Sequence, residues 1–187
     1  SLSYLLMEIK FYSKARTLAA LNEQLKTAKI APLYYFSVGD WAERRSQIIS
    51  LVDAKFNNKN LIVRSSCSQE DKLDVSNAGK FVSILNVSRN GVGSAVDKVI
   101  ESYGVKSPLD EVLIQPMIEN VIMSGVVFSH DPNTCSPYRV INYANGSDTA
   151  VVTSGGGGKV IYKAAEAPVE ETQKFARLLN LLDELLE

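Results

Sequence analysis

Two hydrophobic patterns divide this sequence, and the division constrains the fold more than any other feature. In the first half, apolar residues recur at helical spacing in three segments: 13–25, 41–55 and 92–103. Beyond Ser107-Pro108 the pattern changes to short apolar runs separated by turn residues: 112–114, 125–128, 138–142, 150–152 and 160–162. The sequence therefore predicts an α+β fold in two lobes, residues 1–107 and 108–187, with a ligand bound between them.

Local signals predict where several elements begin and end. Ser13 is expected to cap the first helix and Asp40 the second, because short polar side chains accept hydrogen bonds from the first free helical N–H groups. Pro168 is expected to open a C-terminal helix. The run Leu61-Ile62-Val63 is typical of a strand, and the polar residues after it predict that the strand ends in a loop at Arg64.

Composition excludes several classes of protein. The 20 Lys and Arg residues are balanced by 21 Asp and Glu residues, which leaves no general positive surface for nucleic acid or for a membrane. The longest apolar stretch, residues 121–128, is too short to span a bilayer. Cys67 and Cys135 lack the spacing of zinc ligands and indicate a reducing, cytoplasmic location. An anionic ligand would therefore have to be bound by a few specific Lys or Arg side chains.

Arg64 is the first candidate for such a cation. It follows three apolar strand residues directly, where an unpaired guanidinium would be costly, so it needs an anionic partner. Two partners remain open: an internal acid, Glu70 or Asp71, or a phosphate gripped by two parallel hydrogen bonds. Lys14 would lie in the first turn of its helix; taken alone, it is typical of a solvated surface lysine.

Other polar segments are weaker signals. The segment after Arg64 carries several small or hydroxyl residues: Ser65, Ser66, Ser68, Ser76, Ala78 and Gly79. Such residues favour close approach of backbone N–H groups to a phosphate but are also common in ordinary loops. The four glycines at 155–158 indicate a hairpin connection. His130 is the single histidine, and its place in a turn favours a structural role over nucleophilic catalysis.

Two ordered blocks of sequence resemble one enzyme family. The first block comprises Val63-Arg64-Ser65-Ser66, Glu70-Asp71, Ser76-Asn77-Ala78-Gly79 and Leu85-Asn86-Val87. The second comprises Gln115-x-Met117, Ser124-Gly125-Val126-x-Phe128 and Asp131-Pro132. Together they are similar to the N-terminal nucleotide-binding domain of phosphoenolpyruvate synthase and pyruvate phosphate dikinase. Ser13-Lys14-Ala15 resembles the opening lysine helix of that family more loosely.

The resemblance implies a partial ATP-grasp fold, with ATP and Mg²⁺ in a cleft between two lobes. Lys14 and Arg64 match the phosphate-binding cations of the family. Ser76, Ala78 and Gly79 would belong to the loop over the phosphates. The strand with Gln115 and Met117 would lie along the adenine, with backbone groups reading the base.

The resemblance also implies a transferase, an ATP-dependent kinase whose nucleotide domain passes a phosphoryl group to a histidine on a separate domain of the same parent chain. That domain then delivers the group to pyruvate. His130 does not match the phosphorylated histidine. The sequence stops at Glu187, and we expect the acidic metal-binding strand and the Gln-x-Arg motif of the family to follow it. The expected metal ligands would then lie beyond Glu187, and this fragment alone would be inactive.

One segment departs from the family pattern. Gly146-Ser147-Asp148-Thr149 corresponds to the family's Gly-Leu-Gly-Glu turn but lacks its second glycine and its carboxylate in register. Asp148 is a candidate for a displaced metal-binding carboxylate. The departure leaves two alternatives beside the main prediction: a degenerate module that senses nucleotide or binds a partner without catalysis, or a related dikinase that acts on a sugar, a glucan or an antibiotic.

Overall fold

The structure, a computed structural model, describes residues 13–67, 82–146, 152, 158–165 and 174–186. These residues form two units, each built on an antiparallel sheet, which confirms the predicted α+β class. The first unit holds Ile30–Met117 and the described residues up to Gln24; the second holds Leu25–Lys29 and the described residues from Ile118 onward. The division falls after Met117, not at residue 107 as predicted, because the strand that follows Pro108 pairs within the first sheet.

The sheet of the first unit contains four strands in the order β1-β4-β2-β3. Their bounds are β1 Tyr34–Ser37, β2 Leu61–Ser66, β3 Ser83–Val87 and β4 Glu111–Pro116. Every neighbouring pair is antiparallel. All six residues of β4 are buried, since this strand lies inside the sheet and is covered on both faces.

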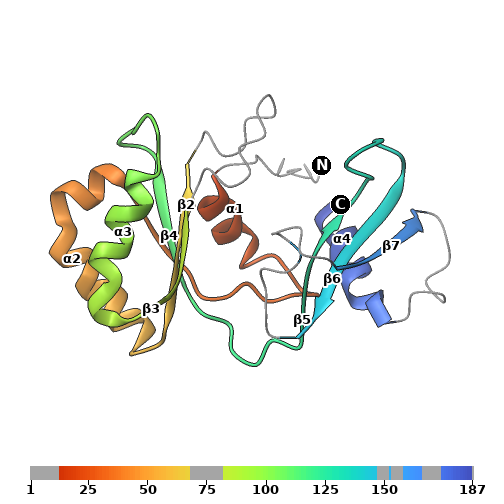
Figure 1. The fold of residues 1–187 in the computed structure, drawn as a ribbon, viewed down its shortest axis with the longest axis horizontal. Helices are drawn as coiled ribbons and strands as arrows, with labels where there is room; N and C mark the ends of the chain where they lie inside the picture. The colour runs from red at the N-terminus through yellow and green to blue at the C-terminus, as the bar shows by residue number, and fades with distance from the viewer. Residues whose placement is uncertain (1–12, 68–81, 147–151, 153–157, 166–173, 187) are drawn as a thin grey trace, which may run out of the picture. The chain divides into compact units, whose positions relative to one another are not determined.

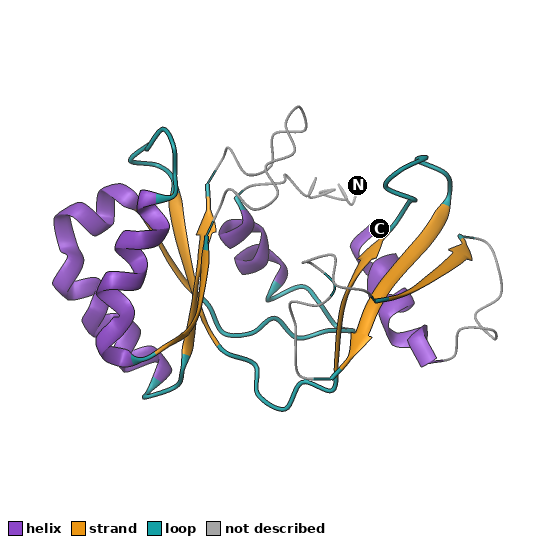
Figure 2. Ribbon diagram, viewed as in Figure 1, coloured by secondary structure: helices purple, strands orange, loops and turns teal. Residues whose placement is uncertain are grey.

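Helices cover both faces of this sheet (Figures 1 and 2). Helices α2 (Val38–Phe56) and α3 (Val92–Glu101) pack on one face, and a short 3₁₀ turn, η1 (Arg89–Gly91), precedes α3. Helix α1 (Lys14–Leu21) lies on the other face. The core between the sheet and α2 and α3 is apolar; its fully buried members include Val52, Val63, Val96, Val99, Val112 and Ile114.

The N-terminal cap of α1 is the residue predicted from the sequence, whereas that of α2 is a different residue. Ser13 caps α1 as predicted, since its side chain accepts the Arg16 N–H at 3.3 Å. The cap of α2 is Ser37, not Asp40, because Asp40 is the third helical residue of a capping box. Ser37 Oγ accepts the Asp40 N–H at 3.0 Å, and the Asp40 carboxylate accepts the Ser37 N–H at 3.2 Å.

A polar cluster joins α2 to α3 at the surface of the first unit. Asp97 accepts hydrogen bonds from Trp41 Nε1 at 2.9 Å and from both terminal nitrogens of Arg45 at 2.8 and 2.7 Å. Burial raises the pKa of Asp97, but the hydrogen bonds from Arg45 and Trp41 outweigh it and hold the pKa below its ordinary value. The Arg45 guanidinium also lies over the Trp41 ring, 4.8 Å from its centroid.

The described residues of the second unit form a three-stranded sheet with a helix packed against it. Its strands β5 (Met123–Phe128), β6 (Tyr138–Asn145) and β7 (Lys159–Ala164) pair in sequence order, and helix α4 spans Ala176–Leu186. The apolar contact between sheet and helix involves Ile141, Tyr143, Phe175 and Leu179. Val152 is the one described residue of the strand predicted at 150–152, and it lies in a turn; Pro168 lies outside the described residues.

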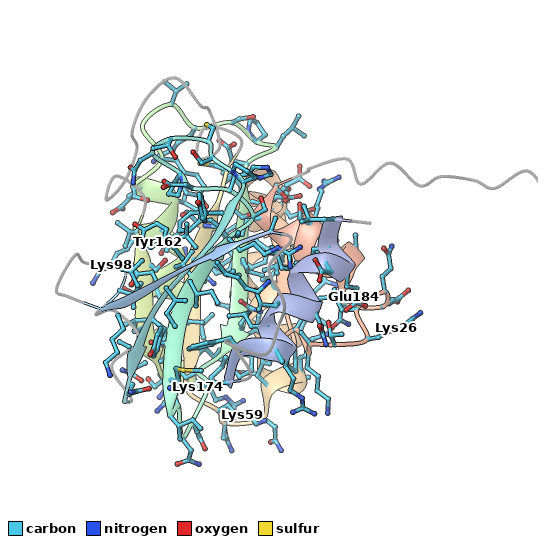
Figure 3. All side chains as sticks on the ribbon, turned by 90° about the vertical axis from the view of Figure 1, so that its right-hand side faces the viewer. Lys26, Lys59, Lys98, Tyr162, Lys174 and Glu184 are labelled. Atoms are coloured by element: carbon cyan, nitrogen blue, oxygen red, sulfur yellow. The ribbon has the colours of Figure 1, made fainter. Side chains whose placement is uncertain are left out.

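Glu184 of α4 binds the segment that follows α1. Its carboxylate accepts the Lys26 N–H at 2.6 Å, the Thr27 N–H at 3.0 Å and the Thr27 hydroxyl. Glu184 and Lys26 are labelled in Figure 3. These hydrogen bonds, led by that from the Thr27 hydroxyl, lower the pKa of Glu184 below its ordinary value. Residues 25–29 therefore belong to the second unit, although the sequence predicted that the first helix continues to Leu25.

Among the helices that the structure describes, none is long and apolar enough to cross a membrane.

Candidate functional site

Arg64 lies inside β2, whereas the sequence predicted that the strand ends before it. It pairs in register with Leu113 of β4 on one side and with Ser83 of β3 on the other. Because side chains alternate along a strand and Val63 points into the core, Arg64 points to the opposite face of the sheet. That is the face on which α1 lies. The backbone of Arg64 is thus fixed by hydrogen-bonded neighbours on both sides.

The Arg64 guanidinium has a buried donor without an acceptor among the described residues. Its Nε atom is shielded from solvent and makes no hydrogen bond to any of them. A buried donor left unsatisfied costs roughly 1–3 kcal/mol. Glu70 and Asp71, the internal acids that the sequence offered as partners, lie outside the described residues.

Helix α1 is attached to the strand that carries Arg64. The backbone N–H of Ala15 donates to Ser66 Oγ at 2.8 Å, and both residues are almost fully buried. Ser66 lies two positions after Arg64 on β2, so the two side chains share one face of the sheet. The first turn of α1 therefore lies on the face to which Arg64 points.

A buried carboxylate on β4 forms the second attachment of α1. Glu111 is 3% exposed, and its side chain accepts hydrogen bonds from Arg16 Nε at 2.6 Å and from the Ser13 hydroxyl. In the sheet, Glu111 is paired directly with Ser66. The two residues that hold α1 are therefore neighbours on adjacent strands.

Lys14 is the first residue of α1. It stands between Ser13, which binds Glu111, and Ala15, which binds Ser66. Its side chain is partly buried. The structure thus brings Lys14 and Arg64 to one face of the first sheet, Lys14 through the helix that begins with it and Arg64 through its strand.

Gln115 and Met117, the residues expected beside an adenine, lie at the end of β4. Gln115 is 7% exposed, and its Nε2 donates to the Ala31 carbonyl at 3.2 Å. The Met117 N–H donates to the Asn60 carbonyl at 2.8 Å. This backbone donor of Met117 is already used within the first unit, so a base bound here would need other backbone groups.

The second sequence block forms β5 in the other unit. Gly125 of this strand packs tightly against β6, since a Cβ atom there would lie 2.3 Å from the Asn142 carbonyl oxygen. Ser124 Oγ and Asn142 Oδ1 are buried and make no hydrogen bond within the described part of the chain. The strand register places both side chains on the same face of the sheet.

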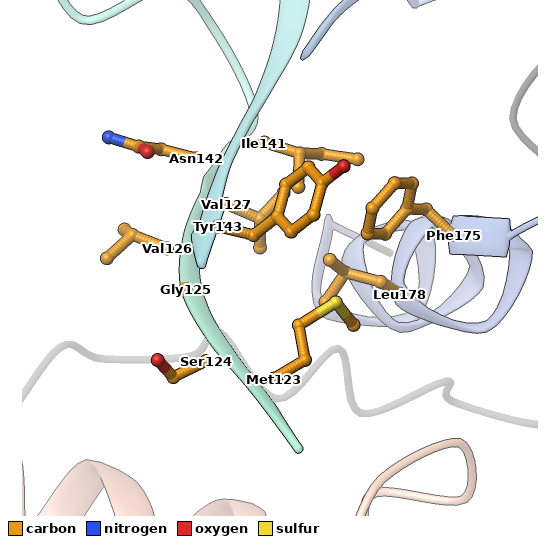
Figure 4. Close-up of a pocket in the computed structure, with 10 residues that line it drawn as sticks. All are labelled: Met123, Ser124, Gly125, Val126, Val127, Ile141, Asn142, Tyr143, Phe175 and Leu178. Carbon is orange, nitrogen blue, oxygen red and sulfur yellow. The ribbon is translucent and has the colours of Figure 1, made fainter. Parts of the chain in front are cut away.

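A pocket of about 210 Å³ lies beside this strand in the second unit. Met123, Tyr143, Phe175 and Leu178 point into it from the sheet and the helix (Figure 4). Ser124, Val126 and Asn142 also line it, but their side chains point to the other side of the sheet (Figure 4). The side chains that face the pocket are thus apolar, apart from the Tyr143 hydroxyl.

Several residues of the expected site are not among those that the structure describes. They are Ser76, Ala78 and Gly79 of the expected phosphate loop and Asp148 of the divergent turn. Glu187, beyond which the metal ligands were expected, also lies outside the described residues, which end at Leu186 in α4. The place of those ligands therefore stays a prediction.

The expected Mg²⁺ would need a group of side chains that could hold it. Within the described ranges, no group of three or more His, Cys, Asp or Glu side chains is arranged to hold a metal ion. The expectation of Mg²⁺ therefore rests on the sequence resemblance.

Sequence reasoning missed the polar residues that attach α1. Glu111 and Arg16 are 95 positions apart, and Ala15 and Ser66 are 51 apart, so no local pattern connects them. The one usable signal was Glu111 itself, a charged residue directly before the apolar run 112–114. A carboxylate at such a position requires a buried partner.

Comparisons with known proteins find likenesses among solved structures and none elsewhere. The sequence matches no family model and no curated protein. Among solved structures, it is similar to PH1788 from Pyrococcus horikoshii Ot3, with 13% sequence identity and a TM-score of 0.48. The match covers 86% of this chain and 60% of PH1788, so the chain spans less than two thirds of that protein. A likeness at this level assigns neither fold family nor function.

Proposed function

We propose that this chain is the nucleotide-binding part of an ATP-dependent phosphotransferase with a partial ATP-grasp fold. In the proposed reaction a phosphoryl group passes from ATP to a histidine on a separate domain and then to pyruvate or a related acceptor. The observation that carries the proposal is the buried Nε of Arg64, which has no partner among the described residues. It lies on the sheet face where the helix that begins with Lys14 is attached.

The chemistry of a phosphate fits the surroundings of Arg64. A guanidinium can donate two parallel hydrogen bonds to phosphate oxygens, and such charge-assisted bonds are about twice as strong as neutral ones. A bound phosphate would supply the acceptor that Arg64 Nε lacks among the described residues. The position of β2 inside the sheet fixes the backbone from which the guanidinium extends, so only side-chain freedom is lost on binding.

The proposed roles require charge neutralisation and positioning rather than a protein nucleophile. Phosphoryl transfer depends on cations that neutralise the oxygens of the transferred group and on alignment of donor and acceptor. Lys14 and Arg64 would supply two such cations, and Mg²⁺ would supply the third positive centre. A cytoplasmic location belongs to the same proposal, because ATP is the phosphoryl donor.

The test is calorimetric titration of Mg-ATP into the full-length protein and two arginine variants. Arg64→Ala is expected to weaken binding by roughly 10- to 100-fold, as expected for a hydrogen bond to a charged group. Arg89→Ala is the matched control, because Arg89 lies in the same unit and is 62% exposed in an ion pair with Asp53. Equal ATP affinity in Arg64→Ala and Arg89→Ala would reject the role of Arg64.

A second candidate function follows from the divergent turn at residues 146–149. Without the family's carboxylate in register, the protein would bind nucleotide as a sensing or interaction module and transfer no phosphoryl group. Incubation of the full-length protein with ATP labelled in both its β- and γ-phosphates separates the two functions. Label that becomes covalently attached to a histidine supports the enzyme, whereas ATP binding without labelling supports the module.

A further inference from the structure

We infer that Glu111 is a positioning residue that fixes the place of Lys14. The part that concerns phosphate binding rests on the proposed function, because it assigns Lys14 to the phosphates. The part that concerns the placement of α1 is independent of any ligand. Three contacts of the first unit carry the inference.

The first contact is the pair formed by Glu111 and Arg16. The Glu111 side chain is 4% exposed and the Arg16 side chain 57% exposed, and Arg16 Nε lies 2.6 Å from Glu111 Oε1. A carboxylate this deeply buried is stable only when its oxygens are hydrogen-bonded. The Ser13 hydroxyl binds the second oxygen, Oε2. Both oxygens of Glu111 are therefore occupied by residues at the start of α1.

The second and third contacts complete the attachment around Lys14. Ser13 precedes Lys14 and binds Glu111, while the N–H of Ala15, which follows Lys14, binds Ser66 at 2.8 Å. Since Glu111 and Ser66 are paired across β4 and β2, the first turn of α1 is held at two adjacent points of one sheet. The backbone of Lys14 has little freedom between these points.

Electrostatics give the carboxylate a further role. The N-terminus of a helix carries a partial positive charge, which disfavours cations in the first turn and favours an anion beside it. Lys14 and Arg16 are both cations of this turn. Glu111 compensates for them, so that α1 begins with a lysine without being displaced from the sheet. Helix α1 has no acidic residue of its own in the first turn.

The test compares Glu111→Gln with Asp97→Asn in the full-length protein. Glu111→Gln keeps the shape of the side chain and removes its charge. Asp97→Asn removes the carboxylate of another arginine pair, on the opposite face of the same unit. We expect Glu111→Gln, and not Asp97→Asn, to increase amide hydrogen exchange in α1 by at least 10-fold. Arg16→Gln breaks the same pair from its exposed side and should act in the same direction, which keeps the test valid if Glu111→Gln folds poorly.

A double-mutant cycle with Lys14→Ala separates positioning from general stability. If Glu111 acts through Lys14, then Glu111→Gln weakens Mg-ATP binding about 5- to 10-fold in the unmodified protein and has little further effect in the Lys14→Ala background. Equal losses in both backgrounds overturn the inference. So does unchanged exchange of α1 in both Glu111→Gln and Arg16→Gln, whatever the binding result. Absence of Mg-ATP binding by the unmodified protein would instead reject the proposed function.

Discussion

The backbone N–H of Ala15 donates a 2.8 Å hydrogen bond to Ser66 Oγ, and this bond attaches α1 to the strand that carries Arg64. Ala15 is fully buried and Ser66 is 1% exposed, so water cannot replace either partner. The contact links residues 51 positions apart. This hydrogen bond explains why Ser66, a residue with a hydroxyl group, is found at the buried end of β2.

Replacing Ser66 tests this attachment. In Ser66→Ala the Ala15 N–H would lose its acceptor in a buried place, and the free energy of unfolding is expected to fall by about 1–3 kcal/mol. Ser50→Ala is the matched control, because Ser50 Oγ donates to its own helix at 3.0 Å on an exposed surface. That variant should stay within about 0.5 kcal/mol of the original protein. Urea unfolding measures both; equal losses would contradict the role of Ser66.

Gly125 is expected to tolerate no side chain. A Cβ atom there would lie 2.3 Å from the Asn142 carbonyl oxygen and 3.0 Å from Tyr143 Cα, so the strands would have to separate. Gly125→Ala should lower the stability of the second unit by about 1–3 kcal/mol or more, as overpacking does. Gly104→Ala is the control, since nothing lies within 4 Å of its added Cβ. Hydrogen exchange of the β5 and β6 amides measures the effect, and unchanged protection in Gly125→Ala would contradict the packing.

Loss of the hydrogen bonds of Glu184 is expected to make the folded protein less stable in acid. The pKa of its carboxyl group is lowered from an ordinary value of 4.5 by hydrogen bonds from the Thr27 hydroxyl and the Lys26 N–H. A lowered folded-state pKa stabilises the fold above the unfolded-state pKa, and this contribution is lost as the pH falls through the folded-state pKa. The contacts to residues 26 and 27 should therefore weaken below pH 4.5.

Glu184→Gln should flatten this part of the acid dependence, whereas Glu101→Gln, on an exposed position of α3, should leave it unchanged. The measurement is the free energy of unfolding between about pH 2 and 6, a range that brackets ordinary carboxyl pKa values. An acid profile of Glu184→Gln identical to that of the original protein would show that the carboxylate does not hold this segment.

Hydrophobic periodicity predicted most elements of the fold, while pairing between distant segments determined the rest. The apolar spacing predicted α1, α2 and α3, and short apolar runs predicted β2, β4, β5, β6 and β7. Val152, from the strand predicted at 150–152, lies in a turn. The domain boundary was wrong because β4 follows a Ser-Pro pair that is typical of a linker, yet returns to pair with β1 and β2. No local pattern reveals which sheet a strand joins.

Errors at element ends have similar physical causes. Arg64, Ser65 and Ser66 were interpreted as a loop because they are polar, but β2 continues through them with β4 as a partner throughout. Ser66 is tolerated in this buried place because its hydroxyl accepts the Ala15 N–H of α1 at 2.8 Å and its own N–H donates to the Tyr103 hydroxyl at 3.3 Å. The start of α2 could have been placed at Ser37 from the sequence, because Ser37 and Asp40 have the spacing of a capping box.

The chemistry of the candidate site stays a prediction, and the structure shows only part of its surroundings. The sequence predicted that Arg64 needs an anionic partner; its buried Nε has no acceptor among the described residues, and the identity of the partner stays a prediction. The attachment of α1 by Glu111 and Ser66 could not be predicted, because it depends on the register between β2 and β4. The roles of Lys14, Gln115 and Met117 toward a nucleotide remain predictions from the sequence resemblance.

The most direct measurement is the affinity of the full-length protein for ATP, tripolyphosphate and adenosine, each with Mg²⁺, by titration calorimetry. Because cations that hold the phosphates would provide most of the binding, we expect ATP to bind at least about 10-fold more tightly than adenosine, which corresponds to about 1.4 kcal/mol. Tripolyphosphate should compete with ATP. Equal affinity for ATP and adenosine, or no binding of ATP, would contradict the account.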